Sequence, residues 1–176
     1  MINRKDQRVG IFIDIQNLYH SSKNLFQARV NYPELIKELT AGRKLIKATG
    51  YVVKTEATEG EASFFEALEK TGIDLRVKDI QIFASGVKKA DWDVGMAIDA
   101  IRLAPSLDVI ILVTGDGDFV PLVEYLKFGL GKGVEVAAFG RSASAKLKEE
   151  TEIFINLDEK PKVILKKRKM KKKNEF

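Results

Sequence analysis

Residues 109–119 read VIILVTGDGDF, and this stretch decides how the rest of the chain is interpreted. The apolar run at its start predicts a strand that is buried on both faces, as in parallel sheets. Two carboxylates, those of Asp116 and Asp118, follow at once with a single glycine between them. Such a pair is either a turn with a helix cap or part of a metal site. The two interpretations are distinguished by whether other polar residues follow the neighbouring strands.

The composition indicates a globular protein without thiol chemistry. The 176 residues are 45% hydrophobic and 31% charged, which suits a single α/β domain. There is no cysteine, which excludes thiol catalysis, disulfides and Cys-based zinc sites. No apolar run approaches the roughly 20 residues that span a bilayer, and the polar N-terminus lacks the apolar stretch of a signal peptide. We expect a cytoplasmic protein that makes no membrane contact.

Positive charge is concentrated at the C-terminus. Residues 160–176 hold nine basic residues and one acid, a net +8, which leaves −3 of the total +5 for the other 159 residues. Runs of like charge repel themselves and are usually disordered. We therefore predict a domain at 1–159 and a disordered basic tail at 160–176. The tail either aids solubility or adds salt-dependent affinity for nucleic acid.

Strands and helices alternate along the predicted domain. Strands are expected at 9–15, 44–54, 73–83, 107–113 and 134–139, with a short edge strand at 153–157. Helices are expected at 32–39, 61–70, 91–104, 119–128 and 144–153. This alternation predicts a doubly wound, mostly parallel sheet of about five strands.

Acidic residues follow more than one strand of this predicted sheet. Asp14 ends the first strand, Asp116 and Asp118 follow the fourth, and Asp93 opens the helix before it. Ligands of doubly wound sheets bind beyond the carboxyl ends of the strands, so these carboxylates could converge there. Their mutual repulsion would be removed by a divalent cation, and oxygen ligands favour Mg²⁺ or Mn²⁺.

Several of these acids have a purely structural alternative. Asp14, Asp116 and Asp118 could serve as caps or turn residues, and Asp91 is best interpreted as an N-cap. Asp93 and Asp99 lie about 240° apart around a helix, so at most one of them points into the site. We choose Asp93, because Asp99 is three residues from Arg102 and could pair with it instead.

Other polar residues are candidates for contacts with substrate. Asn17 and Thr114 would orient ligands or substrate, or would only satisfy backbone groups. His20, the single histidine, is interpreted as structural or as a minor phosphate contact. Four basic residues are expected near the strand ends, where they would contact phosphate: Lys88, Lys89, Arg141 and Lys146.

Three motifs, taken in order, resemble the LabA-like branch of the NYN-domain family, which belongs to the PIN-like nucleases. They are DIQN at 14–17, KKADWDVGMAIDA at 88–100 and TGDGDFVPLV at 114–123. The resemblance covers about residues 8–157 and implies a PIN-like α/β/α sandwich with a Mg²⁺- or Mn²⁺-dependent ribonuclease activity. It also implies catalytic and metal-binding roles for Asp14, Asp93, Asp116 and Asp118, with Asn17 as the family's asparagine. The extra acid at Asp91 leaves the choice between Asp91 and Asp93 open.

These observations favour an endoribonuclease that hydrolyses RNA with a metal-activated water. Asp14 and Asp116 would hold the principal cation, with Asp93 and Asp118 bound directly or through water, and the products would carry a 5′-phosphate. The alternative is a catalytically silent RNA-binding or regulatory module with the same acidic site and basic tail. Other phosphoryl-transfer folds also contain a DxD motif. This chain lacks, at the expected positions, the further acidic residues that those folds require. The identity of the substrate, which could be any structured nucleic acid, is left open. Whether the protein forms a homodimer is also left open.

Overall fold

A six-stranded parallel sheet forms the centre of the protein. The structure is a computed structural model that describes residues 4–54, 58–82, 84 and 88–165. Within these residues the strand order is β4-β3-β1-β7-β8-β9, and every pairing in this sheet is parallel. The bounds are β1 Arg8–Asp14, β3 Lys44–Lys54, β4 Asp74–Asp79, β7 Val109–Val113, β8 Gly133–Ala138 and β9 Ile153–Asn156. The predicted parallel sheet is confirmed, with six strands where about five were expected, because the segment at 153–157 supplies the edge strand β9.

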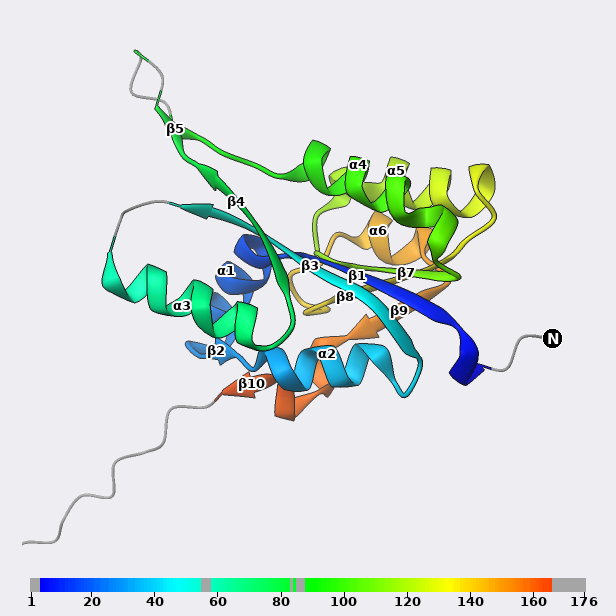
Figure 1. The fold of residues 1–176 in the computed structure, drawn as a ribbon, viewed down its shortest axis with the longest axis horizontal. Helices are drawn as coiled ribbons and strands as arrows, with labels where there is room; N and C mark the ends of the chain where they lie inside the picture. The colour runs from blue at the N-terminus through cyan, green and yellow to red at the C-terminus, as the bar shows by residue number, and fades with distance from the viewer. Residues whose placement is uncertain (1–3, 55–57, 83, 85–87, 166–176) are drawn as a thin grey trace, which may run out of the picture.

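Helices cover both faces of the sheet, as Figure 1 shows. One layer contains α1 Ile15–Phe26, α2 Tyr32–Thr40 and α3 Glu59–Lys70. The other contains α4 Asp93–Leu103, α5 Val120–Glu124 and α6 Ala145–Glu150. The PIN-like α/β/α sandwich is thereby confirmed.

Alternate residues of the central strands divide the core into two clusters. Ile11 and Ile13 of β1 pack towards α1 and α2, whereas Phe12 packs with Met96 of α4 on the other face. All three β1 side chains are fully buried. Helices on both faces explain why the central strands are continuous apolar runs instead of alternating patterns.

Helix α1 was not predicted from the sequence. Its apolar positions, Ile15 and Leu18, are followed by the polar run His20–Asn24, which hides the helical period. The helix begins because the Asp14 carboxylate caps it by accepting a hydrogen bond from the Asn17 backbone N–H at 3.0 Å. A second difference concerns the helix expected at 119–128, where α5 is short and continues as a π-helical turn, Tyr125–Gly129.

The described structure continues beyond residue 159. A 3₁₀ turn, Pro161–Val163, leads into β10, Ile164–Leu165, which pairs antiparallel with β2, Arg29–Val30. Val163 and Ile164 interrupt the basic run and are buried against the domain. These residues therefore belong to the domain and not to a separate tail. The remaining basic segment, 166–176, lies outside the described residues.

Two smaller elements complete the description. A short ribbon, β5 Gln81–Ile82 and β6 Lys88–Lys89, projects from the end of β4, with which β5 was predicted to form one interrupted strand. Single 3₁₀ turns occur at Arg4–Asp6, Ala104–Ser106, Gly117–Phe119 and Leu157–Glu159. No helix of the described chain has the length and apolar character that crossing a bilayer requires.

Candidate metal centre

Three carboxylates meet beyond the carboxyl ends of the central strands. Asp93, Asp116 and Asp118 each offer an oxygen, and these oxygens lie within 4.8 Å of one another. Asp93 is the first residue of α4, whereas Asp116 and Asp118 lie in the loop between β7 and α5. Asp93 and Asp116 are partly buried, and Asp118 is exposed. Such a set of hard oxygen donors from two segments is suited to a divalent cation.

Asp14 lies beside this cluster, on the neighbouring strand. Strands β1 and β7 pair with Ile13 opposite Val113, so the chains leave the sheet together at Asp14 and Thr114. Burial raises the pKa of Asp14, and the nearby charge of Asp116 raises it further. Asp14 is not one of the three residues whose oxygens lie within 4.8 Å of one another. Its carboxylate is held by the first turn of α1 and adds negative charge next to the centre.

The carboxylates of this region repel one another. The pKa of Asp93 is raised to about 6, first by burial and then by the charges of Asp116, Asp14, Asp91 and Asp118. An ordinary aspartate has a pKa near 3.8, so Asp93 holds its proton more tightly than an isolated carboxyl group does. A bound cation would remove this repulsion, and the donor set present therefore fits Mg²⁺ or Mn²⁺.

Hydrogen bonds set the shape of the loop that carries Asp116. Asp116 donates its backbone N–H to the Thr114 hydroxyl at 3.2 Å, and its carboxylate accepts the Asp118 N–H at 2.9 Å. Asn17 Oδ1 accepts the N–H of Gly115 at 2.9 Å, which joins α1 to the loop. Asn17 and Thr114 thus contact the loop itself, which is the structural alternative considered for both residues.

The two glycines of the GDGD motif pack closely against the residues at the start of α6. A Cβ at Gly115 would lie 3.1 Å from the Cα of Ala143, and one at Gly117 would lie 2.7 Å from Ser144 Oγ. Ser144 also donates its backbone N–H to the Gly115 carbonyl. Sequence reasoning missed this role of Ala143 and Ser144. The available signal was the position of Ser144 at the start of a predicted helix, where it is indeed the N-cap.

The structure separates the three acids of the 91–99 segment. Asp93 lies in the cluster, whereas Asp91 is exposed, and its charge raises the pKa of Asp93. The N-cap of α4 is Trp92, so the interpretation of Asp91 as that cap was wrong. Asp99 is buried, accepts a hydrogen bond from the Tyr51 hydroxyl at 3.0 Å and pairs with Arg102. The alternative of an Asp99–Arg102 pair is therefore confirmed.

The basic residues expected near the strand ends differ in their surroundings. Arg141 follows β8 but pairs with Asp158 at 3.1 Å and lies over the Phe26 ring at 4.9 Å. Lys146 is exposed on α6. The backbone of Lys88 and Lys89 forms β6, while their side chains lie outside the described part of the structure.

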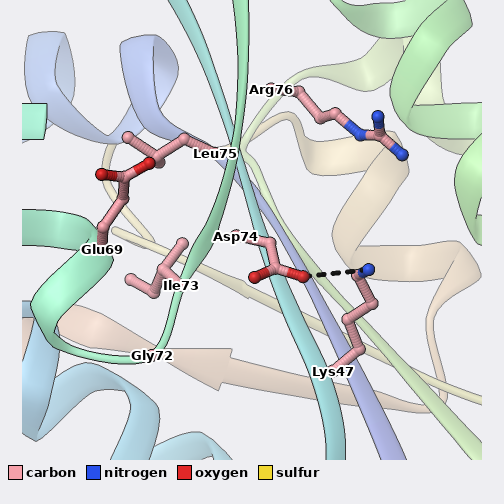
Figure 2. Close-up of a pocket in the computed structure, with 7 residues that line it drawn as sticks. All are labelled: Lys47, Glu69, Gly72, Ile73, Asp74, Leu75 and Arg76. Carbon is pink, nitrogen blue, oxygen red and sulfur yellow. Dashed lines mark ion pairs between the residues drawn. The ribbon is translucent and has the colours of Figure 1, made fainter.

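Two hollows flank the sheet. A groove of about 750 Å³ lies between α1 and α3, and His20 is one of its lining residues. A polar pocket of about 430 Å³, shown in Figure 2, lies at the amino end of β4, where Lys47 pairs with Asp74 at 2.9 Å. This pocket is at the opposite end of the strands from the carboxylate cluster and takes no part in the candidate centre.

A family model named NYN domain matches residues 8–158. The chain belongs to the NYN family. Its resemblance to the LabA-like branch is also confirmed: the chain is 25% identical to the low amplitude and bright protein LabA of Synechococcus elongatus, over 88% of this chain and 86% of that protein. An uncharacterized protein of Methanocaldococcus jannaschii is 35% identical over 54% of this chain and 40% of its own length.

A solved structure shares the whole NYN fold. The crystal structure of a protein of unknown function from Vibrio parahaemolyticus superposes on this chain with a TM-score of 0.85, and the two sequences are 28% identical. The match covers 94% of this chain and 100% of the Vibrio chain. An NYN domain has a nuclease-like fold, which indicates nucleic acid as the class of ligand. The acidic group of this NYN domain could hold a metal ion.

Proposed function

We propose that this NYN protein is a Mg²⁺- or Mn²⁺-dependent endoribonuclease. The observation that supports the proposal is the group formed by Asp93, Asp116 and Asp118 at the carboxyl edge of the sheet. In doubly wound sheets this edge is where ligands bind. The proposal also draws on the family, whose domains are nuclease-like.

The residues of the centre would have different roles in binding the cation. Asp93, Asp116 and Asp118 would hold the cation, and Asp14 would add a fourth carboxylate beside them. A bound divalent cation supplies activation of water and neutralisation of the scissile phosphate. Asn17 and Thr114 position the loop that presents Asp116, through the hydrogen bonds to Gly115 and Asp116. In this arrangement the three-carboxylate group would bind the principal cation, in place of the Asp14–Asp116 pair that was expected from the sequence.

Positive charge would hold the RNA near this acidic centre. Lys146 is exposed on α6, and the basic segment 166–176 follows the domain. Cationic side chains neutralise phosphates and give affinity that falls with salt but does not depend on sequence. Arg141 would have to leave Asp158 to contact a phosphate, so we assign it a structural role in the absence of RNA.

The proposal is tested with end-labelled single-stranded RNA, the purified protein, and Mn²⁺, Mg²⁺ or EDTA. We expect cleavage that requires the cation and leaves 5′-phosphate ends. Cleavage should fall at least 100-fold in Asp116→Asn. The matched control is Asp74→Asn, which alters an exposed carboxylate at the other end of the sheet and should leave the rate unchanged.

The competing outcomes are distinct. Cleavage that continues in EDTA, or that is equal in wild type and Asp116→Asn, would rule out this centre. An RNA with a 2′-deoxy sugar at the cleavage site should still be cut, because the attacking group is water and not the 2′-hydroxyl. RNA binding without products under all conditions would favour the catalytically silent module.

A further inference from the structure

The wall of the groove between α1 and α3 includes residues that directly follow Asp14. The groove has a volume of about 750 Å³, and these residues are Ile15 and Gln16. Val52 and Val53 form another part, and they follow Tyr51, the register partner of Asp14 on β3. The groove therefore includes neighbours of Asp14, the carboxylate that lies beside the three-acid cluster at the carboxyl edge of the sheet.

Four aromatic side chains contribute to the lining of this groove. Tyr19 on α1, Tyr32 at the start of α2, and Phe64 and Phe65 on α3 all contribute. The rings of Tyr32 and Phe64 are 6.1 Å apart, and Tyr19 remains 41% exposed at the rim. Burial and, to a lesser extent, the charge of Asp14 raise the pKa of the Tyr32 phenol.

Cationic side chains border the same opening. Lys23 Nζ lies 5.6 Å from the centroid of the Tyr19 ring, and Arg29 on β2 is exposed and lines the groove. The carboxylate cluster repels an anionic strand unless a cation is bound, whereas these two side chains attract it. A nucleic acid that passes the centre can therefore continue over α1 with its phosphates near Lys23 and Arg29.

We propose that this groove binds an unpaired nucleobase of the RNA strand whose phosphate lies at the metal centre, with Tyr19 stacked on the base. The inference rests on the proposed function and names its substrate as RNA that is single-stranded beside the cleavage site. Single-strand binding proteins stack bases on aromatic rings, whereas a base inside a duplex has no free face for such contact. The volume lies within the range of about 300–1,000 Å³ that is typical of small-ligand sites.

Binding is measured without cleavage, so that it can be judged apart from nuclease activity. The probe is a single-stranded RNA octamer with a 5′ fluorophore, titrated with protein in Ca²⁺ and followed by anisotropy, and a gel checks that the probe stays intact. Ca²⁺ binds oxygen ligands and offsets the carboxylate charge that would otherwise repel the strand. We expect Tyr19→Leu to weaken binding about 5- to 100-fold, the loss typical of one base–aromatic stack. Tyr19→Phe keeps the ring and should bind within two-fold of wild type.

The matched control is Tyr125→Leu, because Tyr125 is 49% exposed and lies in the π-helical turn that continues α5, a helix of the other layer. This variant should bind as wild type does. A duplex of the same sequence, and an octamer whose bases are replaced by abasic sites, should each bind at least five-fold more weakly than the single strand.

Two results would overturn the inference. The first is that the Tyr19→Leu and Phe64→Leu variants are both folded, as judged by circular dichroism, and bind the octamer with a Kd within two-fold of the wild-type value. The other is equal binding of the abasic and normal octamers, which would leave the groove to a different ligand such as a partner peptide. If RNA binding depends on Tyr19 but no cleavage occurs, this inference is supported and the proposed nuclease activity is rejected. If cleavage depends on the metal but Tyr19→Leu does not change it, the nuclease activity is supported and this inference is rejected.

Discussion

Asp93 is a candidate metal ligand whose surroundings disfavour its ionised form. Its carboxyl group is partly buried among other carboxylates, and its pKa is raised to about 6. Between the ordinary value of 3.8 and this value, the folded protein binds a proton that the unfolded chain releases. The contribution of Asp93 to stability is therefore most favourable below about pH 4, and it is lost as the pH rises through 6.

We therefore expect Asp93→Asn to stabilise the metal-free protein at pH 7.5. The gain in free energy of unfolding should be about 1 kcal/mol, since partial exposure lets solvent screen much of the effect. At pH 4 wild type and variant should differ little. Urea unfolding in EDTA at the two pH values measures both effects.

The same variant should lose the stabilisation that a cation gives. Wild type should gain about 2.7 kcal/mol when Mn²⁺ is present at roughly 100 times its Kd, and Asp93→Asn should gain much less. Asp74→Asn serves again as the control and should behave as wild type at every pH. A metal-free Asp93→Asn that is less stable than wild type at pH 7.5 would contradict the repulsion among these carboxylates.

At the scale of elements, the site depends on how the start of α1 meets the loop after β7. Asn17 lies in the first turn of α1, and its side-chain oxygen accepts the N–H of Gly115. Gly115 is buried, and it also packs against Ala143 at the start of α6. One hydrogen bond thus joins two segments that are 98 residues apart in sequence.

Asn17→Ala should leave the Gly115 N–H without a partner. We expect a loss of about 1–3 kcal/mol in the free energy of unfolding, and weaker Mn²⁺ binding because Asp116 is no longer held in place. Asn24→Ala is the matched control, since Asn24 is exposed on the same helix. Urea unfolding and a Mn²⁺ titration give the two readings. If both asparagine variants unfold at the same urea concentration, the hydrogen bond has no measurable role.

At the scale of the whole molecule, a buried ion pair ties the two halves of the sheet together. Arg43 precedes β3 and Glu135 lies on β8, and their side chains form two hydrogen bonds of 2.6 and 2.9 Å. Both side chains are almost completely buried. Arg43 also donates to the carbonyls of Leu39 and Thr40, so its guanidinium is well satisfied. The pair lies towards the amino ends of the strands, away from the metal centre.

Breaking this pair should destabilise the protein without altering the site. Arg43→Met leaves Glu135 as an uncompensated buried charge, which costs about 3–5 kcal/mol. The double variant Arg43→Met/Glu135→Leu should recover most of that loss, because no charge is left unpaired. A double-mutant cycle of urea unfolding measures the coupling, and Mn²⁺ affinity of the folded fraction should not change. A single variant as stable as wild type would show that the pair contributes nothing.

The sequence by itself determined the architecture of the sheet. Apolar runs such as 109–113, placed between helical patterns, allowed a parallel sheet covered on both faces to be predicted, because strands buried on both faces carry mostly apolar side chains. It also placed Asp93, Asp116 and Asp118 near strand ends, since those positions depend only on where strands and helices begin. Helix α1 was missed, because its polar stretch conceals the period that reveals a helix.

Only the tertiary structure decided which side chains meet. It engaged Arg141 with Asp158, whereas the Asp99–Arg102 pair had already been suggested by the sequence spacing. It also brought residues 161–165 into the domain and formed the groove between α1 and α3. Contacts of this kind join segments that are far apart in the chain, and their geometry follows from packing and not from local sequence preference.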